Sequence, residues 1–341
     1  MPQLVSVILP AWNAEKTLEP TLRSVLTQTH RELRVLAVDD GSTDDTPEIL
    51  KRLSAEDPRL LPIYAPNGGP AAARNLALSR LPSETDFIMF LDADDLLLPD
   101  AVEYALLNRE GAELVIFGFS ILQADGSLRP YGEREQLLEK DELGENLARL
   151  YKANLLNQVW AKLYAAPLLE GLRFPDCRWG EDRLFLFEAL FRAEKVKILP
   201  ESKHRYVMQE GESLITRYYE RKFRVCCEID ARMEEMCAEL GVTGERDYRY
   251  MFAKSVFSCL TNLYSRSCGL GRGEKQAAAR RIVNDPRVCR RCRKASGGLP
   301  TRALCAVLHT RWVGLNLLCF HTLAWTGERF PRLFLRLKHR K

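Results

Sequence analysis

The chain has 341 residues, a formal net charge of +4 and 46% apolar residues, which is enough to build a sizeable hydrophobic core. This composition excludes an intrinsically disordered protein. The charge is unevenly distributed, because residues 266–341 contain 18 Lys and Arg against 3 Asp and Glu, whereas residues 1–265 contain 32 against 43. An acidic body with a basic tail argues against a nucleic-acid-binding protein and favours a tail that meets an anionic surface.

The chain starts at Met1 and passes directly into an apolar stretch, without the basic and apolar regions of a signal peptide. We therefore expect a cytoplasmic protein. Its ten cysteines have no framework spacing, which fits a reducing compartment. Cys289 and Cys292 form a lone Cys-x-x-Cys pair without a second Cys or His pair at zinc-site spacing, so ordinary cysteines are favoured over a structural zinc.

Strand-like and helical patterns alternate over the first 120 residues. The apolar runs predict strands, and the helical spacing of apolar residues, with its turn and cap signals, predicts the helices between them. Strands are expected at 4–9, 33–38, 60–64, 87–91 and 113–119, and helices at 18–28, 46–54, 70–81 and 99–110. Because parallel strands need crossover connections, this alternation predicts an α/β fold with a mostly parallel, twisted sheet and helices on both faces.

Unusual polar residues follow four of these predicted strands, in the loops 10–13, 39–44, 66–75 and 92–95. All four loops should lie along one edge of the sheet, where open α/β sheets bind ligands. In the last loop, Asp92 and Asp94 are two residues apart in an extended segment and can hold one divalent cation or its ligand. The alternative is an acidic loop that caps the next helix.

The other loops offer groups for a nucleotide. Trp12 can stack on a base, and Asp40 can accept the imide N–H of a uracil-like ring, a donor that cytosine lacks. Equally, Trp12 can be a packing residue, and Asp39 with Asp40 can form an Asx turn. Arg74 can reach a phosphate, although the preceding Gly-Gly-Pro is also an ordinary turn signal.

Segments 5–13, 38–44, 69–75 and 90–95, in this order and spacing, resemble the amino-terminal half of glycosyltransferase family 2. The resemblance implies the GT-A fold, a nucleotide-diphosphate-sugar donor, Mg²⁺ or Mn²⁺, and inversion at the sugar carbon. It implies that an aromatic ring at Trp12 packs on the base, a carboxylate at Asp40 holds it, Asp92 lies near the ribose and Asp94 binds the metal. The donor-site residues implied are Pro10, Trp12, Asn13, Asp39, Asp40, Arg74, Asn75, Asp92 and Ala93.

An inverting transfer needs a base that takes the proton from the acceptor hydroxyl. Downstream, Gly180 precedes Glu181 and Asp182, and an apolar helical pattern follows. Acidic residues at this place can simply favour a helix N-terminus. The family carries a Glu-Asp pair here with the Asp as base, so the resemblance implies that Asp182 is the base and that Glu181 supports it.

Segment 157–164 resembles the acceptor side of the same family. Trp160 would stack on a sugar face and Lys162 would reach a phosphate or an acceptor oxygen, but both residues are equally compatible with the core. Residues 213–217 resemble the family's flexible lid, in which Arg217 would contact the diphosphate.

The basic tail contains no run of about 20 apolar residues, so a membrane-spanning helix is not expected. Near the end of the chain, apolar residues form a stripe at helical spacing, with arginines on the other faces: Phe330, Leu333, Phe334 and Leu337. A basic amphipathic end of this kind suits an anionic membrane surface. The alternative is a helical subdomain packed on the enzyme or on a second copy.

We interpret the sequence as an inverting glycosyltransferase that uses a UDP-linked donor and extends a cell-surface polysaccharide or lipid-linked glycan at the inner face of the membrane. Residues 1–120 would be the nucleotide-sugar-binding half of the GT-A domain, 121–224 its acceptor-binding half, and 225–341 a helical basic region. The alternative is a catalytically inactive relative that binds nucleotide or glycan as an assembly factor. A dinucleotide-binding domain is disfavoured, because no Gly-x-Gly-x-x-Gly follows the first strand.

Overall fold

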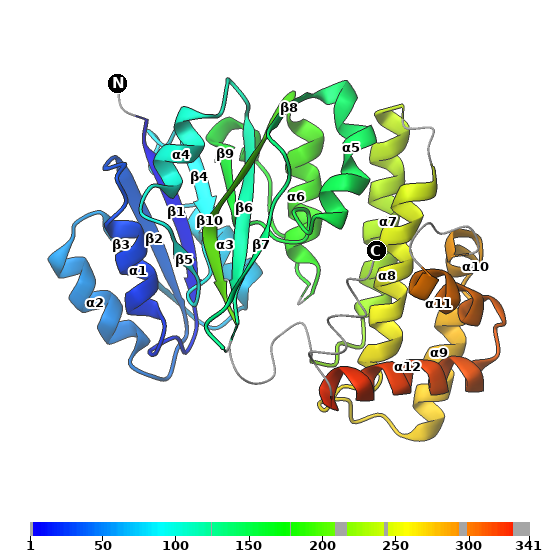
Figure 1. Cartoon of the computed structure of the whole chain (residues 1–341). Coiled ribbons are helices and arrows are strands. Elements are labelled where there is room, and N and C mark those ends of the chain that lie inside the picture. The colour runs from blue at the N-terminus through cyan, green and yellow to red at the C-terminus, as the bar shows by residue number, and fades with distance from the viewer. Residues whose placement is uncertain are drawn as a thin grey trace. The chain divides into compact units, whose positions relative to one another are not determined.

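A computed structural model describes residues 3–123, 125–177, 179–208, 217–241, 245–292 and 299–329. The chain divides into two compact units, residues 1–210 (unit 1) and residues 211–341 (unit 2), which are coloured blue to green and yellow-green to red in Figure 1. Unit 1 combines a sheet with helices, and the described part of unit 2 is helical. The expected fold class, an α/β sheet followed by a mainly helical region, is confirmed.

One sheet runs through the described part of unit 1 in the order β3-β2-β1-β4-β9-β6-β10-β5, with β7 beside β6 and β8 beside β10. Six strands share one direction: β1 (Val5–Ala11), β2 (Leu33–Asp40), β3 (Leu60–Ala65), β4 (Phe87–Phe90), β6 (Leu114–Leu122) and β10 (Lys195–Val207). Four short strands run the opposite way: β5 (Leu96–Leu97), β7 (Leu128–Tyr131), β8 (Gln136–Glu139) and β9 (Lys162–Ala165). The sheet is therefore mixed. Its β3-β2-β1-β4 part is parallel, as predicted, whereas β9 pairs antiparallel with both β4 and β6.

The central strands are apolar along almost their whole length. All residues of β4 are buried, as are the first seven of β6 and all but one of β1. Strands have continuous apolar sequences of this kind when both faces of the sheet are covered, because the side chains on each face are then buried. The core of unit 1 consequently lies on both sides of β1, β4 and β6.

Crossover helices connect the first four strands: α1 (Leu18–Leu26), α2 (Thr46–Glu56) and α3 (Pro70–Leu78). The chain steps outward from β1 to β2 and β3, and then returns to place β4 on the other side of β1. Because such crossovers are right-handed, α1 and α2 share one face of the sheet, where they lie side by side in Figure 1, and α3 covers the other face. The remaining helices of unit 1 are α4 (Ala101–Leu107), the 3-10 turn η1 (Ala166–Leu169), α5 (Lys140–Lys152) and α6 (Glu181–Arg192).

The strand order reverses between β1 and β4. Open α/β sheets bind their ligands at such a reversal, outside the carboxyl ends of the two strands. Here the loop after β1 carries Trp12 and Asn13, and the loop after β4 carries Asp92 and Asp94. The topology therefore brings the predicted nucleotide and metal residues to one place.

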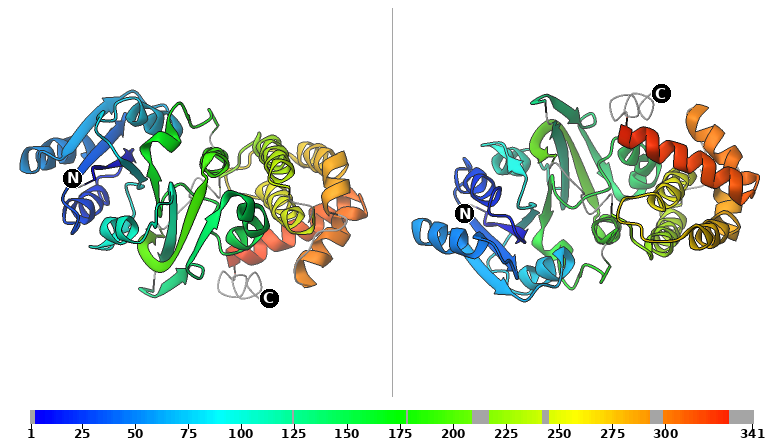
Figure 2. Two further views of the ribbon diagram at one scale, coloured as in Figure 1. Left: turned by 90° about the horizontal axis from the view of Figure 1, so that it is seen from above. Right: turned by 90° about the horizontal axis from the view of Figure 1, so that it is seen from below.

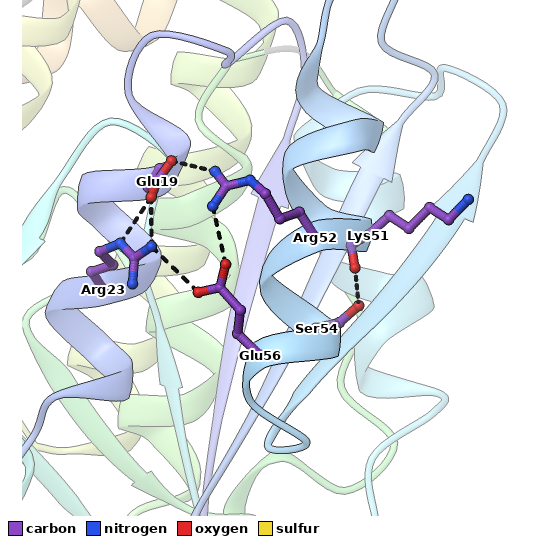
Figure 3. Close-up of polar contacts among 6 residues, drawn as sticks. All are labelled: Glu19, Arg23, Lys51, Arg52, Ser54 and Glu56. Atoms are coloured by element: carbon purple, nitrogen blue, oxygen red, sulfur yellow. Dashed lines mark hydrogen bonds and ion pairs between the residues drawn. The ribbon is translucent and has the colours of Figure 1, made fainter.

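On the solvent side, α1 and α2 are joined by an ion-pair network (Figure 3). Glu19 pairs with Arg23 at 2.7 Å and also with Arg52, while Glu56 pairs with Arg52 at 3.2 Å and with Arg23 at 3.4 Å. All four side chains are a third or more exposed, so water screens their attraction. The network aligns the two helices and contributes little to stability.

Unit 2 is built from six helices in its described part, shown from above and below in Figure 2: α7 (Lys222–Glu239), α8 (Glu245–Asn262), α9 (Arg272–Val283), α10 (Pro286–Cys292), α11 (Leu299–His309) and α12 (Val313–Arg329). The buried Arg291 of α10 ties that helix to α7, where it pairs with Asp230 at 3.4 Å and Glu234 at 2.5 Å. Among the described residues, every helix is too short or too polar to cross a membrane. The predicted amphipathic stripe from Phe330 lies outside the described residues.

Candidate active site

The loops after β1 and β2 are tied to each other. Asn13, in the left-handed region at φ 48°, accepts a hydrogen bond from the Thr43 amide at 2.9 Å and donates its own amide to Ser42 Oγ at 2.9 Å. Asp39 accepts the Ser42 amide at 3.2 Å, a bond that spans three residues of the loop and not the two of an Asx turn. Trp12 is 54% exposed, so its ring is open to a ligand. Asn13 and Asp39 thus shape the loops beside Trp12.

Asp40 is buried at the end of β2, and both of its carboxylate oxygens face the loop after β3. They accept the amides of Gly68 and Gly69 at 2.8 Å each, and Gly69 adopts φ +86°, which side-chain-bearing residues rarely do. Asn67 also donates to the Asp40 carbonyl at 2.9 Å. Asp40 therefore fixes the Gly-Gly turn, and each of its oxygens keeps a second lone pair.

Arg74 joins three elements. It lies on α3 and is 3% exposed; Nη1 donates to Asp182 Oδ1 of α6 at 2.8 Å, and Nη2 donates to Asp92 Oδ1 after β4 at 2.7 Å. Its guanidinium also lies 5.3 Å from the centre of the Phe174 ring. Burial lowers the pKa of Arg74, but the charges of Asp182 and Asp92 outweigh it and hold the pKa above its usual value. The structure thus places the predicted donor carboxylate and the predicted base on one cation.

Glu181 and Asp182 open α6, directly after Gly180 at φ +86°. Burial raises the pKa of Asp182, and the Asp92 charge adds to the rise, whereas Arg74, the Val159 amide and Lys162 oppose it. Burial and the Asp182 charge raise the pKa of Glu181 to about 7. Carboxyl groups with raised pKa values are better suited than ordinary ones to accept a proton near neutral pH.

The acidic loop after β4 separates into two kinds of carboxylate. Asp95 is buried and structural, hydrogen-bonded to His204 Nε2 at 2.9 Å and to the Val207 amide at 3.0 Å. Asp94 is only partly buried; burial, with the charges of Asp95 and Asp92, raises its pKa to about 7. A divalent cation would relieve this repulsion, so Asp94 fits the predicted metal. In the described parts of the chain, no group of three or more His, Cys, Asp or Glu could hold a metal ion.

Three more of the predicted donor-site residues help to fix the main chain around the site. Asn75 makes two hydrogen bonds to the main chain of Phe174. Asn75 Nδ2 donates to the Phe174 carbonyl at 2.9 Å, and the Phe174 amide donates to Asn75 Oδ1 at 2.8 Å. The Ala93 carbonyl accepts a bond from Thr21 Oγ1 at 3.1 Å. Pro10 is half-buried in β1. Their contribution in the structure is to place the neighbouring loops.

The two predicted acceptor residues are both buried. Trp160 stacks on His204, with ring centres 4.3 Å apart, and on Tyr206 at 5.8 Å. Lys162 donates from Nζ to the backbone carbonyls of Gln158 and Trp160, and burial lowers its pKa to about 7 against the pull of Asp182. Neither side chain faces solvent, and both residues pack in the core, which is the alternative that the sequence left open.

Arg217 is exposed and lies in unit 2, where its carbonyl accepts a bond from Asn262 at 2.8 Å. Residues 213–216 of the predicted lid lie outside the described residues. The diphosphate contact of Arg217 stays a prediction.

The sequence patterns did not single out Phe174 and Val159. Phe174 contacts Arg74 and Asn75, and Val159 contacts Asp182. Both act largely through ring or main-chain groups, which leave no polar signal in a sequence. For Phe174, the only available hint was an aromatic residue shortly before the Glu-Asp pair.

Comparison with known proteins places this fold in a class. The crystal structure of Staphylococcus aureus TarS 1–349 in complex with UDP-GlcNAc matches 96% of this chain and 92% of that one, with a TM-score of 0.64 and 19% identity, which shows a common fold. The fold is therefore of the GT-A type. Residues 6–167 match the model of glycosyl transferase family 2, which assigns this part of the chain to that family.

Two curated bacterial relatives agree with this assignment. Glycosyltransferase GlyA of Streptococcus pneumoniae is 31% identical over 266 residues, which are 74% of this chain and 38% of GlyA. The putative teichuronic acid biosynthesis glycosyltransferase TuaG of Bacillus subtilis is 38% identical over 127 residues, which are 36% of this chain and 50% of TuaG. The chain therefore spans less than two thirds of either relative.

Proposed function

We propose that this chain is an inverting glycosyltransferase that moves a sugar from a UDP-linked donor to a hydroxyl of a cell-surface polysaccharide or lipid-linked glycan. The observation that carries the proposal is the contact of Arg74 with both Asp92 and Asp182. It joins a carboxylate of the donor loop to the candidate base. The UDP-GlcNAc complex of TarS supports the choice of donor, and the name of TuaG supports the class of acceptor.

In the proposed reaction, Asp182 accepts the proton of the acceptor hydroxyl while that oxygen bonds to the anomeric carbon. The bond to the diphosphate breaks in the same step, and the nucleoside diphosphate leaves with the electron pair. Attack from the face opposite the diphosphate inverts the carbon. Arg74 holds the Asp182 carboxylate in place, and Glu181 supports it. The base is therefore already oriented when the acceptor binds.

The donor would lie across the carboxyl ends of β1 and β4. Trp12 would stack on the base, Asp40 would hold its imide N–H, and Asp92 would bind the ribose. Asp94 would hold Mn²⁺ or Mg²⁺. When bound, that cation neutralises charge on the departing diphosphate.

We further propose that unit 2 rests on an anionic membrane surface, at the cytoplasmic face where a lipid-linked acceptor would lie. On α12, Leu318 and Trp325 are 64% and 54% exposed and seven residues apart, so they share one face, while Phe320 is buried on the other. The exposed Arg329 follows Trp325 by one turn. With 18 basic and 3 acidic residues in 266–341, charge complementarity favours anionic lipid as the partner of this face.

The experiment that tests the transferase proposal is a thermal-shift panel with UDP, GDP, CDP and TDP, each with Mn²⁺ or EDTA, followed by release of UDP from UDP-GlcNAc. A ligand that binds only the folded state raises the melting temperature. Stabilisation by UDP that needs the metal, with turnover, is expected. Stabilisation without any turnover would favour the inactive assembly factor, and no stabilisation by any nucleotide would contradict the proposal.

A further inference from the structure

The backbone just before β9 is held by two side chains of that strand. Lys162 Nζ donates to the carbonyls of Gln158 at 2.7 Å and Trp160 at 3.1 Å, and Tyr164 Oη donates to the carbonyl of Val159 at 2.9 Å. Lys162 and Tyr164 are two residues apart on a strand and therefore point to the same face. Three consecutive carbonyls are thus bound by one pair of buried donors.

These carbonyls belong to a backbone of unusual shape. Ala161 adopts φ +55°, a conformation that residues other than glycine keep only when their surroundings impose it. The Ala161 carbonyl accepts the Phe117 amide of β6 at 3.2 Å, which anchors the end of the segment in the sheet. Lys162 is fully buried, and a buried ammonium is costly unless it is hydrogen-bonded. Its two bonds to carbonyls give the lysine a structural partner at this turn.

The same segment reaches the start of α6 at two neighbouring points. The Val159 amide lies close enough to the Asp182 carboxylate to lower the pKa of Asp182, and Asn157 Oδ1 accepts a bond from Arg183 at 2.8 Å. The carbonyl side of the segment therefore faces Lys162 and Tyr164, and one of its amides faces the candidate base.

The charged groups around Asp182 come from four elements. They are Arg74 of α3, Asp92 after β4, Lys162 of β9 and Glu181 of α6. Arg74 and Lys162 are the two cations among them. Arg74 contacts Asp182 directly. Lys162 acts on Asp182 through residues 158–160 and through electrostatic attraction.

We propose that Lys162 is a positioning residue for Asp182, holding residues 158–160 so that the Val159 amide meets the carboxylate and placing a buried positive charge beside it. The catalytic consequence rests on the proposed function of Asp182 as base. The structural consequence does not, so the two can fail separately.

The first measurement needs neither donor nor acceptor. In protein labelled with [¹⁵N]valine, the amide signal of Val159, assigned with Val159→Ala, reports the ionisation of Asp182 as the pH is varied. Lys162→Met should move the midpoint of this titration to higher pH, because it removes a cation that favours the charged carboxylate. Asp182→Asn should abolish the titration. A Val159 signal in Lys162→Met that titrates as in the wild type would overturn the proposal.

A matched control is Lys197→Met. Lys197 is likewise a buried lysine of the same sheet, but on β10, where it pairs with Glu110 and Glu135. Its loss should leave the Val159 titration unchanged. If Lys162→Met does not fold, Tyr164→Phe provides a second variant that removes only the bond to the Val159 carbonyl, and a change in the Val159 signal is again expected.

The second measurement is the release of UDP from UDP-GlcNAc. Lys162→Met should lower kcat roughly 10-fold and leave the KM for UDP-GlcNAc within about twofold, because it disturbs the base and not donor binding. If Asp182→Asn keeps its turnover, the base assignment is wrong, and the titration still decides the role of Lys162. If Asp182→Asn is inactive while Lys162→Met has the kcat and pH profile of the wild type, the positioning role is wrong.

Discussion

Arg74 binds Asp182 through one guanidinium nitrogen while the other binds Asp92, so that one buried cation sets the distance between two carboxylates from different elements. The planar fork of arginine suits this task, because its donors point in fixed directions. Asp182 is the proposed base and Asp92 the proposed ribose ligand. Their separation in the folded protein therefore depends on a single side chain of α3.

Arg74→Lys should be strongly damaging although it keeps the charge. One ammonium cannot span both carboxylates, and breaking a buried ion pair costs about 3–5 kcal/mol. We expect the free energy of unfolding, measured in urea, to decrease by up to about 3–5 kcal/mol. Turnover of UDP-GlcNAc should fall by about 100-fold or more. The control is Arg52→Lys in the exposed network of Figure 3, whose melting temperature should stay within about 1 °C of the wild type. Equal behaviour of the two variants would contradict the assignment.

Asp182→Asn should leave UDP binding within about twofold and reduce transfer by about 10²–10⁴-fold, the usual contribution of a general base. The pH dependence of kcat carries a sign. Because the pKa of Asp182 is raised, the base is lost as the pH falls through a value above that of an ordinary Asp. The acid limb of the wild-type kcat profile should lie at this raised pKa. Near-normal turnover of Asp182→Asn would show that another group accepts the proton.

Asp94→Asn should separate stability from metal binding. The pKa of Asp94 in the folded protein, about 7, exceeds its ordinary value, so the unfolded chain ionises first and ionisation of Asp94 lowers stability as the pH rises between the two values. Without metal at pH 7, the variant should melt about 2 °C or more above the wild type. It should also lose the extra stabilisation that Mn²⁺ gives with UDP. Retention of that extra stabilisation would place the metal elsewhere.

Asn75→Ala should be destabilising even without ligand. The side chain makes two bonds to the main chain of Phe174, and leaving partly buried backbone groups unpaired costs about 1–3 kcal/mol. We expect a loss of about 2 kcal/mol in urea unfolding. A suitable comparison is Asn284→Ala, whose single bond to the Arg280 carbonyl is exposed and should contribute less than about 0.5 kcal/mol. A loss no larger than this for Asn75→Ala would remove its structural role.

Trp325→Ser should weaken binding to vesicles that contain phosphatidylglycerol. The exposed indole and the basic charge of unit 2 both favour the anionic surface, so binding should fall several-fold and decline with added salt. Leu107→Ser is the control, because Leu107 is an exposed leucine of α4 in unit 1, and it should not change binding. Sedimentation with vesicles measures both variants. Wild-type protein that binds neutral and anionic vesicles equally, or binds neither, would contradict the membrane proposal.

The sequence predicted the strands that are continuous apolar runs, the four-residue β4 included, but not β9. β1 and β6 are apolar runs bounded by turn signals, and their predicted limits agree with the structure to within a few residues. β9 has four residues and begins with a lysine, so neither length nor hydrophobic pattern marks it as a buried central strand. Its identity depends on tertiary contacts, because the buried Lys162 is hydrogen-bonded to carbonyls that only the folded chain brings together.

For the site, the sequence indicated the residues but not their contacts. Arg74 and Asp182 are 108 positions apart, and local patterns carry no record of a pair at that distance. Asn75 follows Arg74 in a motif that predicts nucleotide contacts, and in the structure its side chain binds the main chain of Phe174. The roles of these residues toward donor and acceptor stay predictions.

The position of β9 limits how this chain can be recombined with its relatives. β9 lies between β4 and β6 and pairs with both, although it follows them in the sequence. A chimera joined near residue 120 would cut through β6 and place a β9 from the relative between β4 and β6 of this chain. The side chains of that β9 would then have to pack against the core of a different protein. The smallest interchangeable part of unit 1 is therefore the whole sheet, and libraries that seek new sugar specificities should exchange loops at its carboxyl edge instead of halves.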